Sequence, residues 1–267
     1  MRVHRLPLIC SCVLAAGLAV SGCAAPAAPG TPQASDDFND PWENTNREIF
    51  SFNQGVDEAV LVPVAKTYRT VLPPPMRQSL HDFMQNLDGP VIFANDLLQG
   101  QVKLAGDTLA RLVLNTTVGV AGMFDVATLI GIPYHTNDLG ITFAVWGFAA
   151  GPYVIVPVLG PSNPRDLVGR VGDGFADPGN YIASAHHLLW AVVTRTVTAG
   201  IDARSRNIES LAVIERTALD NYATIRSLFR QRREAQIRHE KSNLPNPSPV
   251  QGGDDTPASS ISYSIAK

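Results

Sequence analysis

Hydrophobic positions are unevenly distributed along this chain, and a long uncharged run spans residues 139–164, where no Asp, Glu, Lys or Arg occurs. A membrane-spanning helix needs roughly 20 apolar residues, so the run is long enough to enter a bilayer. Glycine and proline interrupt it every few residues, which disfavours a straight helix. The pattern predicts a bent, membrane-seated hairpin over residues 139–161, pivoting near Gly151 and Pro152 with Gly147 and Tyr153 nearby. The alternative is the buried centre of a globular domain.

Amphipathic spacing predicts two helices between residues 40 and 86. Asp40 at an N-cap, Pro41 at the first helical position and Glu43 three residues after the cap fit a capping box, so a helix should extend from there to about residue 56. Pro63 is expected to interrupt the pattern. After the rigid bend of three consecutive prolines, a second helix should cover residues 76–86.

A third helix, over residues 90–114, contains a polar stripe. Its members are four residues apart: Asn95, Gln99, Lys103, Asp107 and Arg111. Side chains at that spacing are neighbours on a helix, so Lys103 should pair with Asp107, and Asp107 with Arg111. The stripe is either the solvent face of a surface helix or the polar lining of a water-filled passage whose apolar side faces lipid or protein.

Three further positions predict helix starts. Asp125 should cap a short helix, Asn163 should cap one that ends near residue 171, and Asp177 should cap one that continues through residue 193. Proline at the first helical position supports the last two.

Residues 201–241 are rich in charge, with nine basic and six acidic side chains around helically spaced apolar positions. They predict an amphipathic helix that faces the aqueous side. The charged face is either simply solvated or, at residues 230–233, in contact with anionic head groups or an acidic partner.

The N-terminus has the pattern of a targeting segment. Arg2 and Arg5 precede an apolar stretch, and Val20-Ser21-Gly22-Cys23 resembles a bacterial lipobox, which implies cleavage before Cys23 and acylation of its sulfur. An ordinary secretory signal is the alternative. The predicted organisation is a signal peptide at 1–22, an acylated flexible tether at 23–38, a folded membrane-embedded domain at 39–241 and a disordered tail at 242–267.

Composition narrows the classes of protein. With 45% hydrophobic and only 17% charged residues, against about 25% charged in a typical soluble domain, the chain is expected to contact something other than water. A net charge of −3 disfavours nucleic acid as a partner. Cys10 and Cys12 leave with the signal peptide, so no disulfide or cysteine-zinc site is expected, and no cofactor beyond the acyl groups on Cys23.

Catalytic motifs are missing from the sequence. It contains no Gly-x-Ser-x-Gly elbow, phosphate loop or His-Glu-x-x-His motif. His186 and His187 are adjacent and point about 100° apart on a helix, so they do not converge on one metal. His135 and Asp138 share a loop and are the candidates for acid–base chemistry, but no nucleophile accompanies them. We therefore expect neither an enzyme nor a metal site.

Short motifs in a fixed order give a more specific signal. They are Asp40-Pro41, Glu43, Asn46-Arg47, Phe52-Asn53, Pro63-Val64-Ala65, Tyr68-Arg69, Asn86-Leu87, Leu98-Gln99-Gly100, Asn115-Thr116, Asp125-Val126-Ala127, Asp138-Leu139-Gly140, Thr142-Phe143, Gly151-Pro152-Tyr153, Gly160-Pro161-Ser162 and Arg165-Asp166. With these motifs, residues 40–177 resemble the VacJ/MlaA family of outer-membrane phospholipid-transport lipoproteins.

The resemblance implies an all-α fold, a disc or ring of long helices with short interfacial helices and the apolar hairpin, enclosing a polar passage. It implies a protein anchored at the periplasmic side of the outer membrane that removes mislocalised phospholipids from the outer leaflet and so maintains lipid asymmetry. The implied partners are phospholipids, trimeric porins and a periplasmic lipid carrier that feeds an ATP-driven inner-membrane transporter. The alternatives are a porin-associated scaffold without transport activity and a lipid hydrolase that uses His135.

Overall fold

The computed structural model describes residues 39–244, which belong to a compact unit that begins at Asn39. The predicted signal peptide, the tether with its acylated Cys23, and the tail beyond residue 244 lie outside the described residues.

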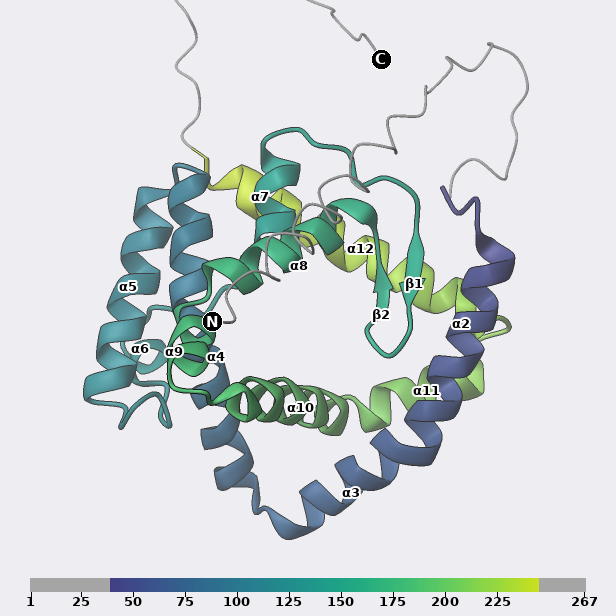
Figure 1. Cartoon of the computed structure of the whole chain (residues 1–267), viewed down its shortest axis with the longest axis horizontal. Helices are drawn as coiled ribbons and strands as arrows, with labels where there is room; N and C mark the ends of the chain where they lie inside the picture. Colours follow the sequence, from purple (N-terminus) through teal and green to yellow (C-terminus); the bar gives the residue numbers. More distant parts are fainter. Residues whose placement is uncertain (1–38, 245–267) are drawn as a thin grey trace, which may run out of the picture. The chain divides into compact units, whose positions relative to one another are not determined.

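The described unit is almost entirely helical, which confirms the predicted all-α class (Figure 1). None of the helices within residues 39–244 has both the length and the hydropathy needed to cross a membrane. The elements in chain order are α2 (Glu43–Val56), η3 (Asp57–Leu61), α3 (Val62–Val71), α4 (Pro74–Leu98), α5 (Val102–Thr117), α6 (Val126–Leu129), α7 (Leu139–Val145), β1 (Val154–Val156), β2 (Gly160–Ser162), α8 (Pro164–Ala176), α9 (Pro178–Ala185), α10 (Leu189–Arg206), α11 (Ile208–Thr217) and α12 (Asn221–Ser242).

The first helical segments differ from the prediction at both ends. The N-cap is Trp42, without a side-chain cap bond, and the carboxylate of Asp40 instead pairs with Arg226 of α12, so the capping-box prediction was wrong. Pro63 does not interrupt the helix, because it lies in the first turn of α3 just after the π-helical η3. Proline is tolerated there, since the hydrogen-bond pattern already changes at the π turn.

Helices α4 and α5 form a hairpin, and their bounds differ from those of the second and third predicted helices. Helix α4 continues through Pro90, and the chain reverses at Gln99–Gln101, where Gly100 has a φ of 74°. Glycine adopts this left-handed conformation without the Cβ penalty that other residues meet. A single helix over residues 90–114 was therefore wrong, and the polar stripe is divided between two antiparallel helices.

The uncharged run contains a helix and a β-hairpin, and its predicted pivot was misplaced. Helix α7 ends at Val145, and the reversal falls between β1 and β2, which pair with Val154 opposite Ser162 and Val156 opposite Gly160. Asn46 of α2 secures the hairpin: its Oδ1 accepts from the Ile155 amide at 2.9 Å, and its Nδ2 donates to the Tyr153 carbonyl at 3.1 Å. The amide side chain of α2 thus satisfies backbone groups of a short strand at its edge.

The caps predicted by local sequence are confirmed, but the helix ends are not. Asp125, Asn163 and Asp177 each accept a hydrogen bond from a backbone amide at the start of α6, α8 and α9. Helix α8 continues to Ala176, five residues beyond its expected end. The helix from Asp177 stops at Ala185, and the chain resumes as α10, α11 and α12, so a single helix over residues 201–241 was wrong.

Neighbouring elements contact one another in a closed series within this unit. Figure 1 shows α12 along one side and α10 with α11 along the other, with α4 near one end and α2 at the opposite end. Helix α12 packs on α7 and β2, α7 on α8, α8 on α4, and α4 on α10. Helices α7 and α8 approach closely because both have glycine at the crossing, and a Cβ at Gly169 would overlap the backbone of Gly140.

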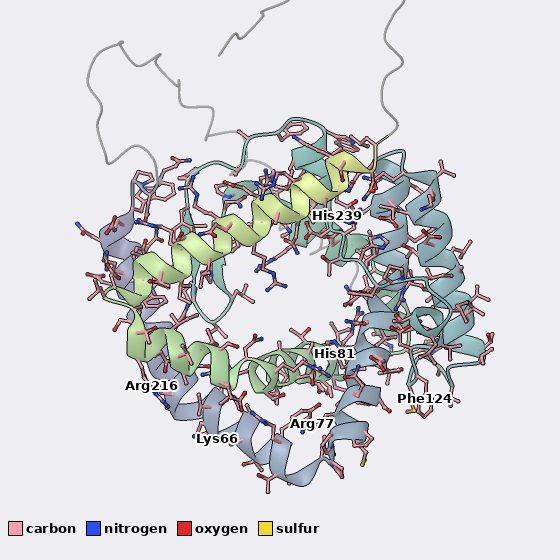
Figure 2. The ribbon with its side chains drawn as sticks, turned by 180° about the vertical axis from the view of Figure 1, so that it is seen from behind. Lys66, Arg77, His81, Phe124, Arg216 and His239 are labelled. Atoms are coloured by element: carbon pink, nitrogen blue, oxygen red, sulfur yellow. The ribbon has the colours of Figure 1, made fainter. Side chains whose placement is uncertain are left out.

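Many large apolar side chains are exposed on these helices. Val102 is 74% exposed, Leu129 85% and Phe175 71%. Figure 2 shows Phe124 at the outer edge of the unit near α5, whereas His81 of α4 reaches α10, where its ring lies 2.8 Å from Asp202. Exposed apolar surface on this scale is typical of a protein or membrane contact.

Candidate functional site

Helices α4, α5 and α7 are joined by a network of buried polar side chains around Asp96. This fully buried carboxylate accepts hydrogen bonds from Asn137 at 2.8 Å and from Thr108 at 2.7 Å, and it lies 3.1 Å from Nε2 of His135. Burial lowers the pKa of His135, but the hydrogen bond and charge of Asp96 outweigh this effect and raise it. A buried charge is stable only with such partners, so these hydrogen bonds hold Asp96 in place between the helices.

Asn95 and Gln99, the first two members of the polar stripe, belong to the same network. The Nδ2 of Asn95 donates to Asp173 of α8 at 2.9 Å, and its Oδ1 accepts from Thr142 of α7 at 2.7 Å. Gln99 donates to Asn137 at 2.8 Å. Both side chains are more than nine-tenths buried. Their role as passage lining stays a prediction.

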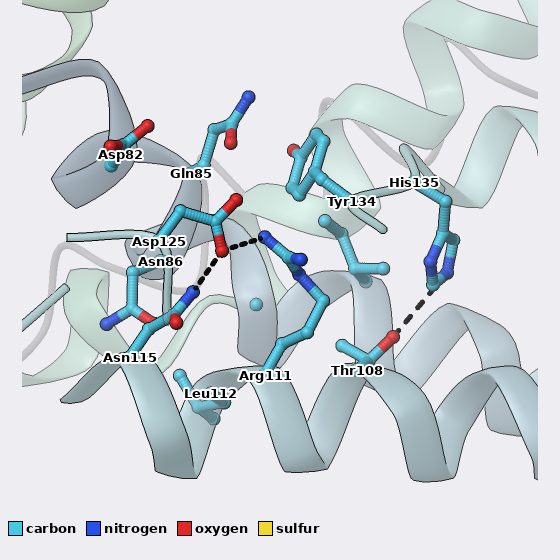
Figure 3. Close-up of a pocket in the computed structure, with 12 residues that line it drawn as sticks. Asp82, Gln85, Asn86, Thr108, Arg111, Leu112, Asn115, Asp125, Tyr134 and His135 are labelled. Atoms are coloured by element: carbon cyan, nitrogen blue, oxygen red, sulfur yellow. Dashed lines mark hydrogen bonds and ion pairs between the residues drawn. The ribbon is translucent and has the colours of Figure 1, made fainter. Parts of the chain in front are cut away.

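The other three stripe residues lie on α5 in different surroundings. Lys103 is exposed and Asp107 half-buried, whereas Arg111 is buried and pairs with Asp125 at 2.9 Å rather than with Asp107 (Figure 3). Asn115 donates to the same carboxylate at 3.1 Å. The small cavity beside them, about 20 Å³, has room for about one water. Arg111 therefore holds the α6 segment against α5.

Two larger pockets lie beside α8. The first, which we call the acidic pocket, has a volume of about 290 Å³ and is lined by Asp88, Val91, Ile92, Tyr134, Thr136, Asn137, Asp173, Gly174, Asp177 and Arg195. Arg195 pairs with Asp88 at 2.7 Å and with Asp177 at 2.5 Å. Within residues 39–244, Asp173 accepts hydrogen bonds from Asn95 and the Leu139 amide but forms no ion pair, and burial raises its pKa. Two of the three carboxylates in this pocket therefore share its one guanidinium.

The second, the cationic pocket, has a volume of about 320 Å³ and is lined by Asp138, Pro161, Asp166, Arg170, Phe229, Arg232, Arg233 and Gln236. Arg233 of α12 binds Asp138 through two hydrogen bonds of 2.7 Å and contacts Asp166 at 2.8 Å. Burial raises the pKa of Asp166, but Arg233 and Arg165 outweigh it and hold the pKa below its usual value. Both carboxylates are therefore neutralised within the protein.

Arg170 and Arg232 complete the cationic pocket without such partners. Both side chains are exposed, and within residues 39–244 neither forms an ion pair. Sequence reasoning missed Arg170, although Asp166, Arg170 and Asp173 recur at helical spacing on α8 and that repeat is a readable signal. Arg232 belongs to the basic run for which head-group contact was one hypothesis.

The predicted hairpin residues do not gather at one place. Gly147 is exposed, Gly151 lies against Pro164, and Tyr153 is buried beside Tyr222 and Phe229. The hairpin role assigned to these residues and to Pro152 stays a prediction.

The candidate acid–base residues, His135 and Asp138, contact different groups. His135 faces Asp96 and Thr108, while Asp138 caps α7 and binds Arg233. The loop that carries both therefore does not bring them together. In the described part of the chain, no group of three or more His, Cys, Asp and Glu side chains is arranged to hold a metal ion.

This helical architecture has relatives of known family. Residues 38–236 match the family described as MlaA lipoprotein. A Haemophilus influenzae protein named intermembrane phospholipid transport system lipoprotein MlaA is 32% identical over 85% of this chain and 90% of its own. A Rickettsia bellii protein without a functional name is 32% identical over 79% of this chain and 82% of its own.

A solved structure shares the fold. It is described as the structural basis for maintenance of bacterial outer membrane lipid asymmetry, and it superposes with a TM-score of 0.67 at 29% identity, covering 74% of this chain and 98% of that one. The chain belongs to the MlaA lipoprotein family, and the resemblance inferred from its motifs is confirmed.

Proposed function

We propose that this protein is an outer-membrane lipoprotein that removes mislocalised phospholipids from the outer leaflet and passes them to a periplasmic lipid carrier. The carrier would feed an ATP-driven transporter of the inner membrane. The family membership and the name of the Haemophilus influenzae relative support this role. The observation that carries the proposal is a helical unit with exposed apolar side chains on its helices and charged pockets between them.

The physical basis is the cost of moving a charged head group through hydrocarbon. An isolated charge in an apolar medium is strongly disfavoured, and charged residues at the bilayer centre are accordingly rare. A unit that offers lipid an apolar exterior and offers head groups a charged interior lowers that cost without covalent chemistry. We therefore assign transport rather than catalysis.

The exposed apolar surface also favours a second function, that of a scaffold which associates with trimeric porins. Large exposed apolar patches mark protein interfaces as well as membrane contacts. A scaffold would need the apolar exterior but not the charged pockets.

The experiment that separates the two compares cells with and without the protein. Outer-leaflet phospholipid should accumulate in its absence and return to normal when the gene is restored, and mass spectrometry should find intact phospholipid on the detergent-extracted protein. Normal asymmetry with no bound lipid, together with porin binding, would favour the scaffold. Fatty-acid release that is lost in His135→Asn would instead indicate a hydrolase.

A further inference from the structure

We propose that a single phospholipid binds across two adjoining pockets, with its phosphate at Arg170 and Arg232 and an acyl chain in an apolar pocket beside Ile225. The proposal rests on the transport function proposed above and assigns it a binding site. The apolar pocket has a volume of about 160 Å³ and is lined by Phe50, Asn53, Gln54, Asp57, Ile155, Gly160, Pro161, Leu211, Ile214, Glu215, Asn221 and Ile225.

The two pockets adjoin at β2, and α12 contributes residues to both. Pro161 lines both of them. Helix α12 contributes Ile225 to the apolar pocket, then Phe229 and Arg232 to the cationic one, at spacings of four and three residues that place all three on one helix face. Seven residues of helix separate Ile225 from Arg232, about 10 Å at 1.5 Å per residue. Along this face the surroundings change from apolar to cationic, as they do from the tail to the head of a phospholipid.

Charge balance selects the phosphate. Arg233 pairs with both Asp138 and Asp166, and Arg165 also pairs with Asp166, so each carboxylate of the cationic pocket already has a guanidinium partner. Arg170 and Arg232 remain, both exposed and without an ion pair within residues 39–244. Guanidinium groups bind phosphate oxygens through paired hydrogen bonds. The two arginines therefore offer positive charge to an anionic phosphodiester.

The apolar pocket selects an acyl chain rather than a soluble phosphate ester. Its lining includes five large apolar side chains, Phe50, Ile155, Leu211, Ile214 and Ile225. Apolar walls of this kind favour an occupant that brings hydrocarbon out of water. The acidic pocket, farther along α8, does not suit a phosphate, because its carboxylates outnumber its arginine.

The first test measures lipid binding to the full-length lipoprotein in detergent. Short-chain phosphatidylglycerol is titrated into wild type, into the double variant Arg170→Gln/Arg232→Gln and into Arg238→Gln. The last is a matched control on the exposed face of α12, where Arg238 pairs with Glu234. We expect the double variant to raise the Kd about tenfold or more and the control to leave it unchanged. Circular dichroism and thermal unfolding check that each variant is folded.

Two further ligands separate the lipid from other sources of phosphate. Inorganic phosphate should bind wild type more weakly than phosphatidylglycerol, and diacylglycerol should bind with an affinity that the double variant does not change. Equal affinity for inorganic phosphate would overturn the acyl-chain half of the proposal. A phosphatidylglycerol with a photoreactive group on one acyl chain should label the segments that line the apolar pocket, residues 50–57, 155–161 and 211–225, and labelling confined to other segments would overturn the assigned pocket.

The outcome for this site is distinguishable from the outcome for transport. If the folded double variant binds lipid and restores outer-leaflet asymmetry as well as wild type does, the site is wrong and the transport function stands. If wild type neither binds phospholipid nor affects asymmetry, both fail.

Discussion

The two pockets beside α8 are similar in size and opposite in charge. Their volumes are about 290 and 320 Å³, and α8 supplies Asp173 to the acidic pocket but Asp166 and Arg170 to the cationic one. In the cationic pocket every carboxylate has a guanidinium partner and arginines remain in excess. In the acidic pocket Arg195 is shared by two carboxylates and Asp173 has none. Successive turns of one helix thus line a site suited to an anion and a site that repels it.

The difference lies in how each carboxylate is compensated. Asp166 is buried but keeps its charge, because two arginines lower its pKa. Asp173 receives only amide donors, and burial raises its pKa. Neighbouring charges and desolvation act in opposite directions on a buried acid, so the two pockets respond differently to the same substitution.

The largest effect should follow from Arg233→Met, which removes the guanidinium that pairs with both carboxylates of the cationic pocket. Asp138 and the buried Asp166 would lose their shared partner, and removing one member of a buried ion pair costs about 3–5 kcal/mol. Urea unfolding should show this loss in the free energy of unfolding. The neighbour Arg232→Met is the control and should change it by less than about 0.5 kcal/mol, because Arg232 is exposed. Equal losses in both variants would contradict the assignment.

Replacing a carboxylate of α8 by an amide should distinguish the cationic pocket from the acidic one. Asp166→Asn should cost about 1.5–3 kcal/mol at pH 7, because it removes charge-assisted hydrogen bonds. The pKa of Asp166 is lowered on folding, so its stabilisation is present above the unfolded pKa and is lost as pH falls through the folded value. The deficit of the variant, measured by thermal unfolding across pH, should therefore shrink only under acidic conditions.

Asp173→Asn should behave in the opposite way. The raised pKa means that the folded state favours the protonated acid, so wild type gains stability as pH falls toward that pKa and the variant lacks this gain. At pH 7 the substitution should cost little, since an amide oxygen can still accept from Asn95 and Leu139. A loss at pH 7 as large as that of Asp166→Asn would show that the two carboxylates are equivalent.

The last effect concerns His135, which lies between two residues that line the acidic pocket, Tyr134 and Thr136. Asp96 and Glu240 raise its pKa and Arg111 opposes them, with burial also opposing. Stabilisation from the raised pKa is present below the unfolded value and is lost as pH rises through the folded value. Wild type should therefore exceed His135→Gln by on the order of 1 kcal/mol near pH 6 and by less near pH 9. Thermal unfolding at both pH values measures this, and a difference independent of pH would contradict it.

Local sequence determined the class of the protein and several helix starts. The caps at Asp125, Asn163 and Asp177 were predictable because a side chain and an amide two or three residues away interact without help from the rest of the chain. The ordered motifs also placed the chain in its family. The expected membrane contact agrees with the exposed apolar side chains, which composition already suggested.

Tertiary structure decided where helices end and which charged side chains are left exposed rather than paired within the protein. Pro63 and Pro90 do not break helices, whereas Gly100 ends one, because packing and the turn geometry outweigh local propensity. The polar stripe divides at that turn, and Asn95 is buried while Lys103 is exposed. Arg232 and Arg233 are adjacent and equivalent in sequence. The approach of Asp138 and Asp166, both far from Arg233 in sequence, engages Arg233 and leaves Arg232 exposed, because ion pairing depends on distances that the fold alone creates.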